Sequence, residues 1–261
     1  MRLMKRILSA AAVLALSASL LVGCSSGTAS SVPVSASSAA ESTVSSVEET
    51  ASSAVDENEA AAAQLLNDLT GSYQELWPVI LADEYKQTWL DDCTALVGED
   101  NAEAAFEKLS SMVTGDVYGE DAVKAYANGG GAYFCGFTNS LATLTFDGET
   151  STISGTDKDG NVLFSHTYHY IGMEPVRGLY EFESDDADSG EFTYFFLAPD
   201  TSAETYHSEF RYGSDAEALS QYDAGEYAYW LASGISTDCD QTMIDNCIEL
   251  FCTENLAGSN A

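Results

Sequence analysis

Residues Leu141–Ser154 read LATLTFDGETSTIS, and this stretch carries the clearest fold signal in the chain. The period of two over Leu141–Phe146 indicates a strand with one buried face. Asp147-Gly148 is a dipeptide typical of tight hairpin turns, and Glu149–Ser154 has the composition of a partner strand. The stretch therefore predicts a β-hairpin.

The same pattern continues toward the C-terminus with regular turn signals, of which Asp159-Gly160 is the next. Four further strands are predicted at Asn161–Tyr170, Gly178–Glu183, Glu191–Leu197 and Thr205–Tyr212. About six short consecutive antiparallel strands can close into a barrel or a sandwich, and closure removes exposed sheet edges. We therefore expect a mainly antiparallel barrel.

Helical spacing flanks this β region on both sides. Apolar residues recur three and four apart over Ala60–Val113, where Gly71 and Pro78 divide the pattern into short pieces. Two more helices are predicted at Asp215–Ser233 and Asp240–Glu254. The predicted fold class is α+β: an antiparallel β-barrel with flanking short helices.

Composition supports a folded domain and excludes some functions. The chain has 261 residues, 45% of them hydrophobic, and carries 42 acidic residues against 9 basic ones. Binding to nucleic acid needs clustered lysine and arginine side chains to contact phosphates, so we expect no nucleic-acid partner. A surface this acidic attracts cations, although charge alone does not define a site.

The N-terminus predicts export and a lipid anchor. Arg2, Lys5 and Arg6 precede an apolar run over Ile7–Val22, which is the pattern of a secretory signal and is too short to span a membrane. The tetrapeptide Leu21–Cys24 resembles the bacterial lipobox. That resemblance implies a lipoprotein signal peptide over residues 1–23, with Cys24 S-lipidated (palmitate) at the extracytoplasmic face of the cell membrane. The alternative is an ordinary cleaved signal followed by a chance cysteine.

Residues 24–60 are predicted to be a flexible linker. They consist mostly of Ser, Ala, Val, Thr and Glu, without aromatic residues or hydrophobic period. Such a segment buries too little apolar surface to offset the entropy of ordering. The folded domain is expected over residues 61–257.

Beyond Cys24 the chain has five cysteines: Cys93, Cys135, Cys239, Cys247 and Cys252. Disulfides persist outside the cytoplasm, so this number allows two bridges and one free thiol, but spacing does not give the pairing. One of them, Cys247, falls on the apolar face of a predicted helix, where a buried thiol is at least as good an interpretation as a bridge.

Four segments of the chain match motifs that occur together in one known family. Leu66–Pro78 is similar to that family's opening pattern, with aromatic and apolar size kept better than identity. Tyr168–Arg177 contains the Tyr-x-Tyr-x-Gly and Val-Arg elements of its central strands. Phe192–Pro199 and His207–Asp215 resemble Phe-Ser-Asp-His-Ile-Ile-Ala-Pro and His-Phe-His followed by Gly-x-Asp. Together these segments resemble the ZinT (YodA-type) family of zinc-binding domains.

This resemblance implies a lipocalin-like (calycin) barrel that is exported and binds zinc at one end through three histidines. It also implies a link to zinc capture for an ABC importer. The three histidine positions fall on Phe195, His207 and Glu209, so two of the three differ from the family pattern.

His207 and Glu209 remain as candidate metal ligands. They lie two apart in a predicted strand and so share a face, which we expect to be the inner one, and imidazole plus carboxylate suits zinc. Four-coordinate zinc usually takes at least three protein ligands, so another donor is needed. Candidate donors are His166, His169, Glu204 and Glu191, of which the two histidines, three apart, should lie on opposite faces.

Two other functions stay open. The barrel could have lost its metal and could bind an organic ligand or a protein partner in a cavity lined by Tyr194, Phe195 and Tyr206, with His207 an ordinary strand histidine. A hydrolytic enzyme with a metal-bound water would need a third ligand and an open coordination position together. The favoured expectation is a non-enzymatic lipoprotein that binds zinc or another divalent metal.

Overall fold

The computed structural model of the chain describes residues 57–126, 131–199 and 207–258. The predicted signal peptide, Cys24, most of the linker, Glu204 and Tyr206 lie outside these residues. Within the three described ranges, no helix is long and apolar enough to cross a membrane.

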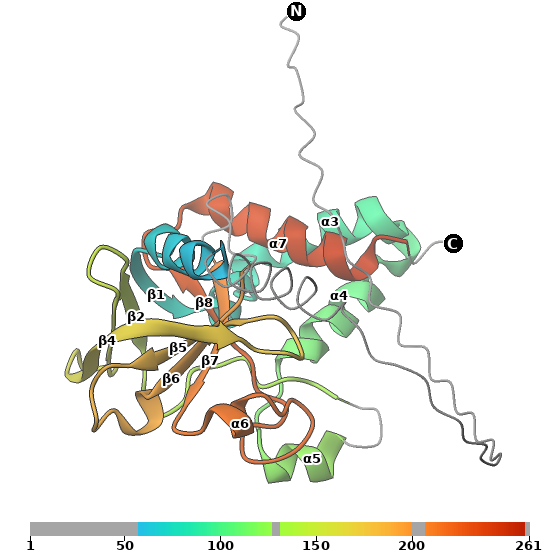
Figure 1. Cartoon of the computed structure of the whole chain (residues 1–261). Helices are drawn as coiled ribbons and strands as arrows, with labels where there is room; N and C mark the ends of the chain where they lie inside the picture. Colours follow the sequence, from blue (N-terminus) through green and yellow to red (C-terminus); the bar gives the residue numbers. More distant parts are fainter. Residues whose placement is uncertain (1–56, 127–130, 200–206, 259–261) are drawn as a thin grey trace, which may run out of the picture. The chain divides into compact units, whose positions relative to one another are not determined.

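Eight antiparallel strands form a closed barrel in which each strand pairs with its neighbour in sequence and β1 pairs with β8 (Figure 1). The strands are β1 Gly71–Glu75, β2 Thr143–Asp147, β3 Thr152–Thr156, β4 Val162–Met173, β5 Tyr180–Ser184, β6 Tyr194–Leu197, β7 His207–Gly213 and β8 Ala232–Ser236. The helices around them are α2 Leu76–Ile80, α3 Lys86–Val97, α4 Glu99–Val113, α5 Glu120–Tyr126, α6 Ala216–Leu219 and α7 Gln241–Leu256. This architecture confirms the predicted α+β barrel with flanking helices.

The predicted hairpin is formed by β2 and β3, but its turn is longer than two residues. Phe146 is opposite Ile153, and Gly148–Ser151 lie between the strands. The Asp147 carboxylate accepts hydrogen bonds from the N–H groups of Glu149 and Thr150, which holds the turn. The Asp-Gly signal therefore marked the hairpin correctly, although the side-chain bonds of the aspartate set a wider turn.

The two strands that close the barrel, β1 and β8, were not predicted. The expected helix over Asp215–Ser233 is wrong: only α6 forms there, and the chain then leads into β8. Arg211 explains this, because its buried guanidinium donates hydrogen bonds to the main-chain carbonyls of Leu219, Gln221 and Tyr227. These bonds supply donors to carbonyls of the irregular segment that have no partner in a helix.

The β8 strand shows no alternation of apolar and polar residues in the sequence because both of its faces are buried. Every residue of Ala232–Ser236 is buried, and the strand packs between β1 and β7. A strand with both faces covered has no polar face to reveal its period. The prediction of helix through Gly71–Glu75 is wrong for a related reason, because this five-residue strand is too short to break the helical spacing on either side of it.

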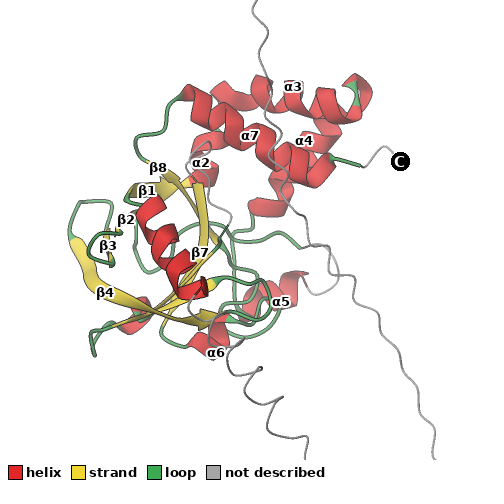
Figure 2. Cartoon of the chain, turned by 45° about the horizontal axis from the view of Figure 1, so that its top comes forward, coloured by secondary structure: helices red, strands yellow, loops and turns green. Residues whose placement is uncertain are grey.

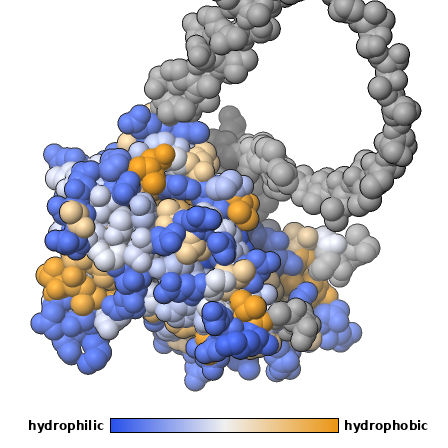
Figure 3. All heavy atoms as spheres, turned by 60° about the horizontal axis from the view of Figure 1, so that its bottom comes forward, coloured by the Kyte–Doolittle hydropathy of each residue, from blue (hydrophilic) through white to orange (hydrophobic). Residues whose placement is uncertain are grey.

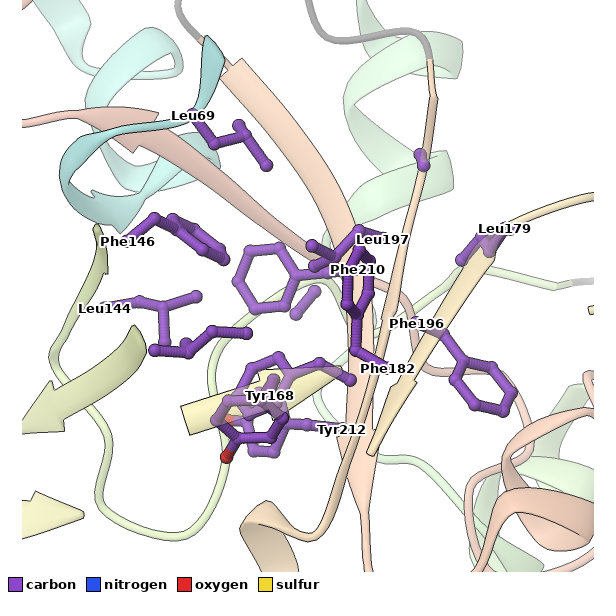
Figure 4. Packing of buried hydrophobic residues seen from close by; sticks show 14 of the residues in the cluster. Leu69, Leu144, Phe146, Tyr168, Leu179, Phe182, Phe196, Leu197, Phe210 and Tyr212 are labelled. Atoms are coloured by element: carbon purple, nitrogen blue, oxygen red, sulfur yellow. The ribbon is translucent and has the colours of Figure 1, made fainter. Parts of the chain in front are cut away.

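Large aromatic and aliphatic side chains fill the interior of the barrel (Figure 4). Phe195, Phe210 and Tyr212 are fully buried. The ring of Tyr212 stacks on Phe195 with a centroid distance of 5.3 Å, and its hydroxyl accepts a hydrogen bond of 2.6 Å from the N–H of Thr138. The barrel thus has a packed core at the level of these rings.

The helix at residues 57–68 contributes to this barrel core. Ala62, Leu65 and Leu66 are buried in it together with Leu69, which follows the helix and lies at the upper edge of the side chains drawn in Figure 4. This first described helix therefore covers part of the barrel and joins its core.

A second core lies outside the barrel, where α2, α3, α4 and α7 pack together (Figures 1 and 2). Ile235 on the outer face of β8 belongs to this helical core, so the helices rest on the β8 wall. The predicted helix over Asp240–Glu254 is confirmed as α7, whose N-cap Asp240 accepts a hydrogen bond from the N–H of Met243. The space between β7, α2 and α7 contains a small pocket.

Candidate metal site outside the barrel

His207 and Glu209 lie on the outer face of β7. The alternate residues Phe210 and Tyr212 point into the barrel core, so the odd-numbered side chains face outward. The expectation that this histidine and this carboxylate share a face is met, but the expected inward direction is wrong. Burying two large rings inside the barrel is favourable, whereas burying an ionisable pair there would require compensating partners.

A small pocket opens in front of these two side chains, between β7, α2 and α7. Its volume is about 70 Å³. Its walls are formed by Leu76, Trp77, Ile80, His207, Glu209, Cys247, Leu250, Phe251 and Glu254. The rings of Trp77 and Phe251 meet edge to face at 4.7 Å and form one apolar side of it. The pocket therefore joins polar groups from a strand and a helix with an apolar wall.

Four side chains around this pocket are of types that bind zinc: His207 and Glu209 from β7, and Cys247 and Glu254 from α7. Cys247 and Glu254 are seven residues apart, which is two helical turns and places them on the same face of α7. A water molecule occupies about 30 Å³, so the pocket has room for one ion with one or two waters. In the described parts of the chain, no three His, Cys, Asp or Glu side chains are arranged to hold a metal ion.

Burial and the neighbouring negative charges disfavour the ionised form of the Cys247 thiol. Burial raises the pKa of Cys247 to about 12, and the charges of Glu209, Cys239 and Glu254 add to the shift. Cys247 is therefore protonated at neutral pH, and a metal ion would have to displace that proton before the sulfur could bind it. The imidazole and the carboxylates are the better donors.

Glu209 borders a second pocket as well. This space, of about 220 Å³, is lined by Arg177, Leu179, Ala198, Pro199, Glu209 and Leu231. Glu209 thus borders both the pocket that contains His207 and a pocket that contains the cationic Arg177. Its charge also reaches Cys135, whose pKa is raised to about 12 by burial and, secondarily, by Glu209.

The two other histidines do not join this site. They lie on opposite faces of β4, as predicted from their spacing, with His166 half-buried and His169 exposed. The Nδ1 atom of His166 is 2.8 Å from an Asp186 oxygen, and that of His169 is 2.7 Å from an Asp185 oxygen. Because β5 and β6 separate β4 from β7, neither ring reaches the outer β7 face near His207.

Glu191 is also excluded as the missing ligand. It lies in a short 3₁₀ helix over Gly190–Phe192, where its carboxylate accepts hydrogen bonds from the hydroxyls of Ser214 at 3.3 Å and Tyr227 at 3.2 Å. Both partners follow the opposite end of β7 from His207. Glu204 lies outside the described residues.

Phe195, His207 and Glu209, which occupy the three histidine positions of the resembled family, do not lie together in the structure. Phe195 is fully buried inside the barrel against Tyr168 and Tyr212, whereas His207 and Glu209 are outside the sheet. The expected cavity lined by Tyr194 and Phe195 is wrong, since the two side chains alternate across β6 and the Tyr194 hydroxyl donates to Glu183, opposite it on β5. The barrel interior at this point is filled by side chains.

Sequence reasoning missed Cys247 and Glu254 as members of the site. Their helical face was identified, but the element against which it packs was not. A glutamate at the end of an otherwise apolar helix face was the one available signal.

Neither the family models nor the curated protein sequences contain a match for this chain. Among solved structures, the Zn(II)-bound ZinT-like domain of Streptococcus pneumoniae AdcA matches 70% of this chain and 89% of its own, with 16% identity and a TM-score of 0.45. Zn(II)-bound AdcA from the same organism matches 74% of this chain and 35% of its own, with 16% identity and a TM-score of 0.40. The first of these structures is a ZinT-like domain, which is the family that the sequence motifs resemble.

Proposed function

We propose that this chain is an extracytoplasmic, lipid-anchored protein that binds a divalent metal ion, with zinc as the preferred ion, in the pocket between β7 and α7. The observation that carries the proposal is the shared outward face of His207 and Glu209, which opens onto a pocket that also contains Cys247 and Glu254. An imidazole with one or two carboxylates and a nearby thiol is a donor set suited to zinc.

Glu254 is the side chain that would complete the site. It is exposed and lies near the end of α7, where a change of side-chain rotamer meets little resistance. His207, Glu209 and Glu254 would then supply three ligands, and water would take the fourth position. The apolar wall of Trp77 and Phe251 would lower the local dielectric and strengthen the attraction between ion and carboxylates.

A site that must be completed by a side-chain movement favours exchange over storage. The formal net charge of −33 raises the cation concentration near the protein, and hydrophilic residues cover most of the face shown in Figure 3. Such a protein would collect ions at the cell surface and release them again. The resemblance to ZinT domains suggests an ABC importer as the receiver, and the proposal needs no catalytic step.

The test is isothermal titration of the full chain with Zn²⁺. We expect one site with a dissociation constant in the micromolar range or tighter, weakened at least about tenfold by His207→Ala or Glu209→Gln because each removes one ligand. His169→Ala is the matched control. It removes an exposed histidine that lies on β4, away from the site, and hydrogen-bonds to Asp185. Wild-type binding weaker than tens of micromolar, or an unchanged affinity in His207→Ala, would contradict the proposal.

A second candidate function rests on a larger pocket beside α2. It has a volume of about 330 Å³, which is within the range of small-molecule sites. Its lining is mainly apolar, with the Glu75 carboxylate as its charged group: Glu75, Trp77, Pro78, Leu81, Val113, Thr114, Gly115, Phe134, Cys135 and Gly136. It fits a small apolar molecule with a donor for Glu75, and native mass spectrometry of the protein purified from its producing cell would detect such a ligand.

A further inference from the structure

Two cysteines from opposite ends of the domain meet in the helical core. Cys93 on α3 and Cys252 on α7 are 159 residues apart in sequence, and their Sγ atoms are 3.9 Å apart. Both residues are fully buried. Two thiols this close can be oxidised to a disulfide where the surroundings are oxidising, as they are for the extracytoplasmic protein of the proposed function.

The packing around the two sulfurs fixes the helices relative to each other. Trp89, one turn before Cys93, contacts Phe251 of α7 at a centroid distance of 5.9 Å and donates a 2.7 Å hydrogen bond to the Ile80 carbonyl. Ile248, one turn before Cys252, is fully buried in the same core. The two helices are therefore held side by side where the thiols meet.

We propose that Cys93 and Cys252 form a structural disulfide that links α3 to α7 in the exported protein. A disulfide has a sulfur–sulfur distance of about 2.05 Å, so each atom must move by roughly 1 Å, which small side-chain rotations provide. Among the described residues, no other two cysteine side chains hydrogen-bond to each other, and the Sγ of Cys135 faces the Tyr133 carbonyl at 3.7 Å. This assigns one bridge and leaves Cys135, Cys239 and Cys247 as thiols.

The bond forms by thiol–disulfide exchange with a disulfide-bearing oxidant of the extracytoplasmic space. One cysteine, as thiolate, attacks the oxidant's disulfide, giving a mixed disulfide and releasing one thiolate of the oxidant. The second cysteine, as thiolate, attacks the protein-bound sulfur and releases the oxidant's other thiolate. The protein loses two protons and two electrons, and the oxidant's disulfide is reduced to two thiols.

Burial sets the order of events. Both thiols are fully buried once the two helices are docked, so an oxidant cannot reach them there. The exchange therefore takes place before α7 settles on α3. Once formed, the bond is protected from reductants by the same core and restrains the unfolded chain across most of the domain.

The experiment uses the full chain with Cys24→Ser, so that five thiols remain, refolded with oxidised glutathione. After alkylation and proteolysis, mass spectrometry should find a peptide joining Cys93 to Cys252, with the other three cysteines alkylated. Protein that is unfolded, reduced and then refolded in the presence of a reductant should melt about 10 °C below the oxidised protein, the shift expected for loss of a bridge that closes a long loop.

Single and double serine variants complete the test. Cys93→Ser, Cys252→Ser and the double variant should melt at the same temperature as one another and should no longer respond to reductant, whereas the control Cys239→Ser should respond like the parent. If serine variants fail to fold, the reductant response and the peptide map of the parent decide. Five alkylatable thiols after oxidative refolding, or a linked peptide joining other cysteines, would overturn the proposal.

Discussion

The main-chain N–H of Gly148, in the turn between β2 and β3, donates a 3.0 Å hydrogen bond to the hydroxyl of Thr70, the residue that leads into β1. This bond joins the hairpin to the segment that follows the helix at residues 57–68. A β-carbon at position 148 would overlap the backbone of Asn67 in that helix. The turn and the helix are therefore packed so closely that only a glycine fits at position 148.

Gly148→Ala should destabilise the protein by about 1 to 3 kcal/mol, because the added methyl group must push the helix away from the hairpin. Gly172→Ala is the control, since a β-carbon there meets only one side-chain atom, at 4.0 Å. Urea unfolding measures both. Equal stability of the two variants would contradict the close contact.

Arg211→Lys should lower the free energy of unfolding by about 3 kcal/mol or more, because buried carbonyls would lose their hydrogen-bond donor. The guanidinium of Arg211 is fully buried and binds three main-chain carbonyls, which one ammonium cannot reach in the same fork geometry. Arg177→Lys serves as comparison, because Arg177 is exposed and stacks on the Tyr222 ring at 4.5 Å. Thermal unfolding should show a large loss for the first variant and a small one for the second.

Glu254→Gln should weaken zinc binding severalfold, because the amide removes the charge that would complete the proposed site. Glu249→Gln, on the same helix and outside the pocket, should leave the titration unchanged. Circular dichroism of both variants checks that α7 is intact. Identical zinc affinities for these two variants would exclude Glu254 as a ligand but would leave His207 and Glu209 to be judged by their own variants.

Alkaline pH should destabilise the reduced protein. Burial raises the pKa of Cys135 from 9.0 to about 12, so between these values the unfolded chain loses a proton that the folded chain keeps. The stability is therefore unaffected below about pH 9 and falls above it, by about 1.4 kcal/mol per pH unit for this thiol. Unfolding in urea at about pH 8 and pH 10 measures the loss, and Cys135→Ala should reduce the slope.

Cys24→Ala should release the protein from the membrane fraction, because it removes the sulfur that the predicted lipid anchor requires. Ser25→Ala changes the neighbouring residue and should have no effect. Incorporation of labelled palmitate into the wild type, but not into Cys24→Ala, is the direct measurement. A Cys24→Ala chain that stays with the membranes would contradict the anchor.

The sequence predicted those parts of the barrel whose two faces differ. Strands β2 to β7 each keep a period of two or a turn signal at their ends, and α7 has both an N-cap and an apolar face. The short β1 and the fully buried β8 lack these signals. Closure of the barrel depends on these two strands, so the strand number was underestimated.

For the site, the pattern gave the pairing of His207 with Glu209 but not its direction. The period of two required that they share a face, and the structure has this arrangement. The presence of Phe210 and Tyr212 at the alternate positions was the signal that the other face is the buried one. Which helix covers the outer face depends on tertiary packing and could not be read from spacing.

A barrel filled with aromatic rings changes where an ion can enter and leave. At the proposed site an ion would enter between the barrel wall and α7, so the rate of its release should follow the loosening of α7 rather than the opening of a barrel mouth. A covalent link from α7 to α3 would slow that loosening. The oxidation state of Cys93 and Cys252, which are not themselves ligands, would then set how long the metal stays bound.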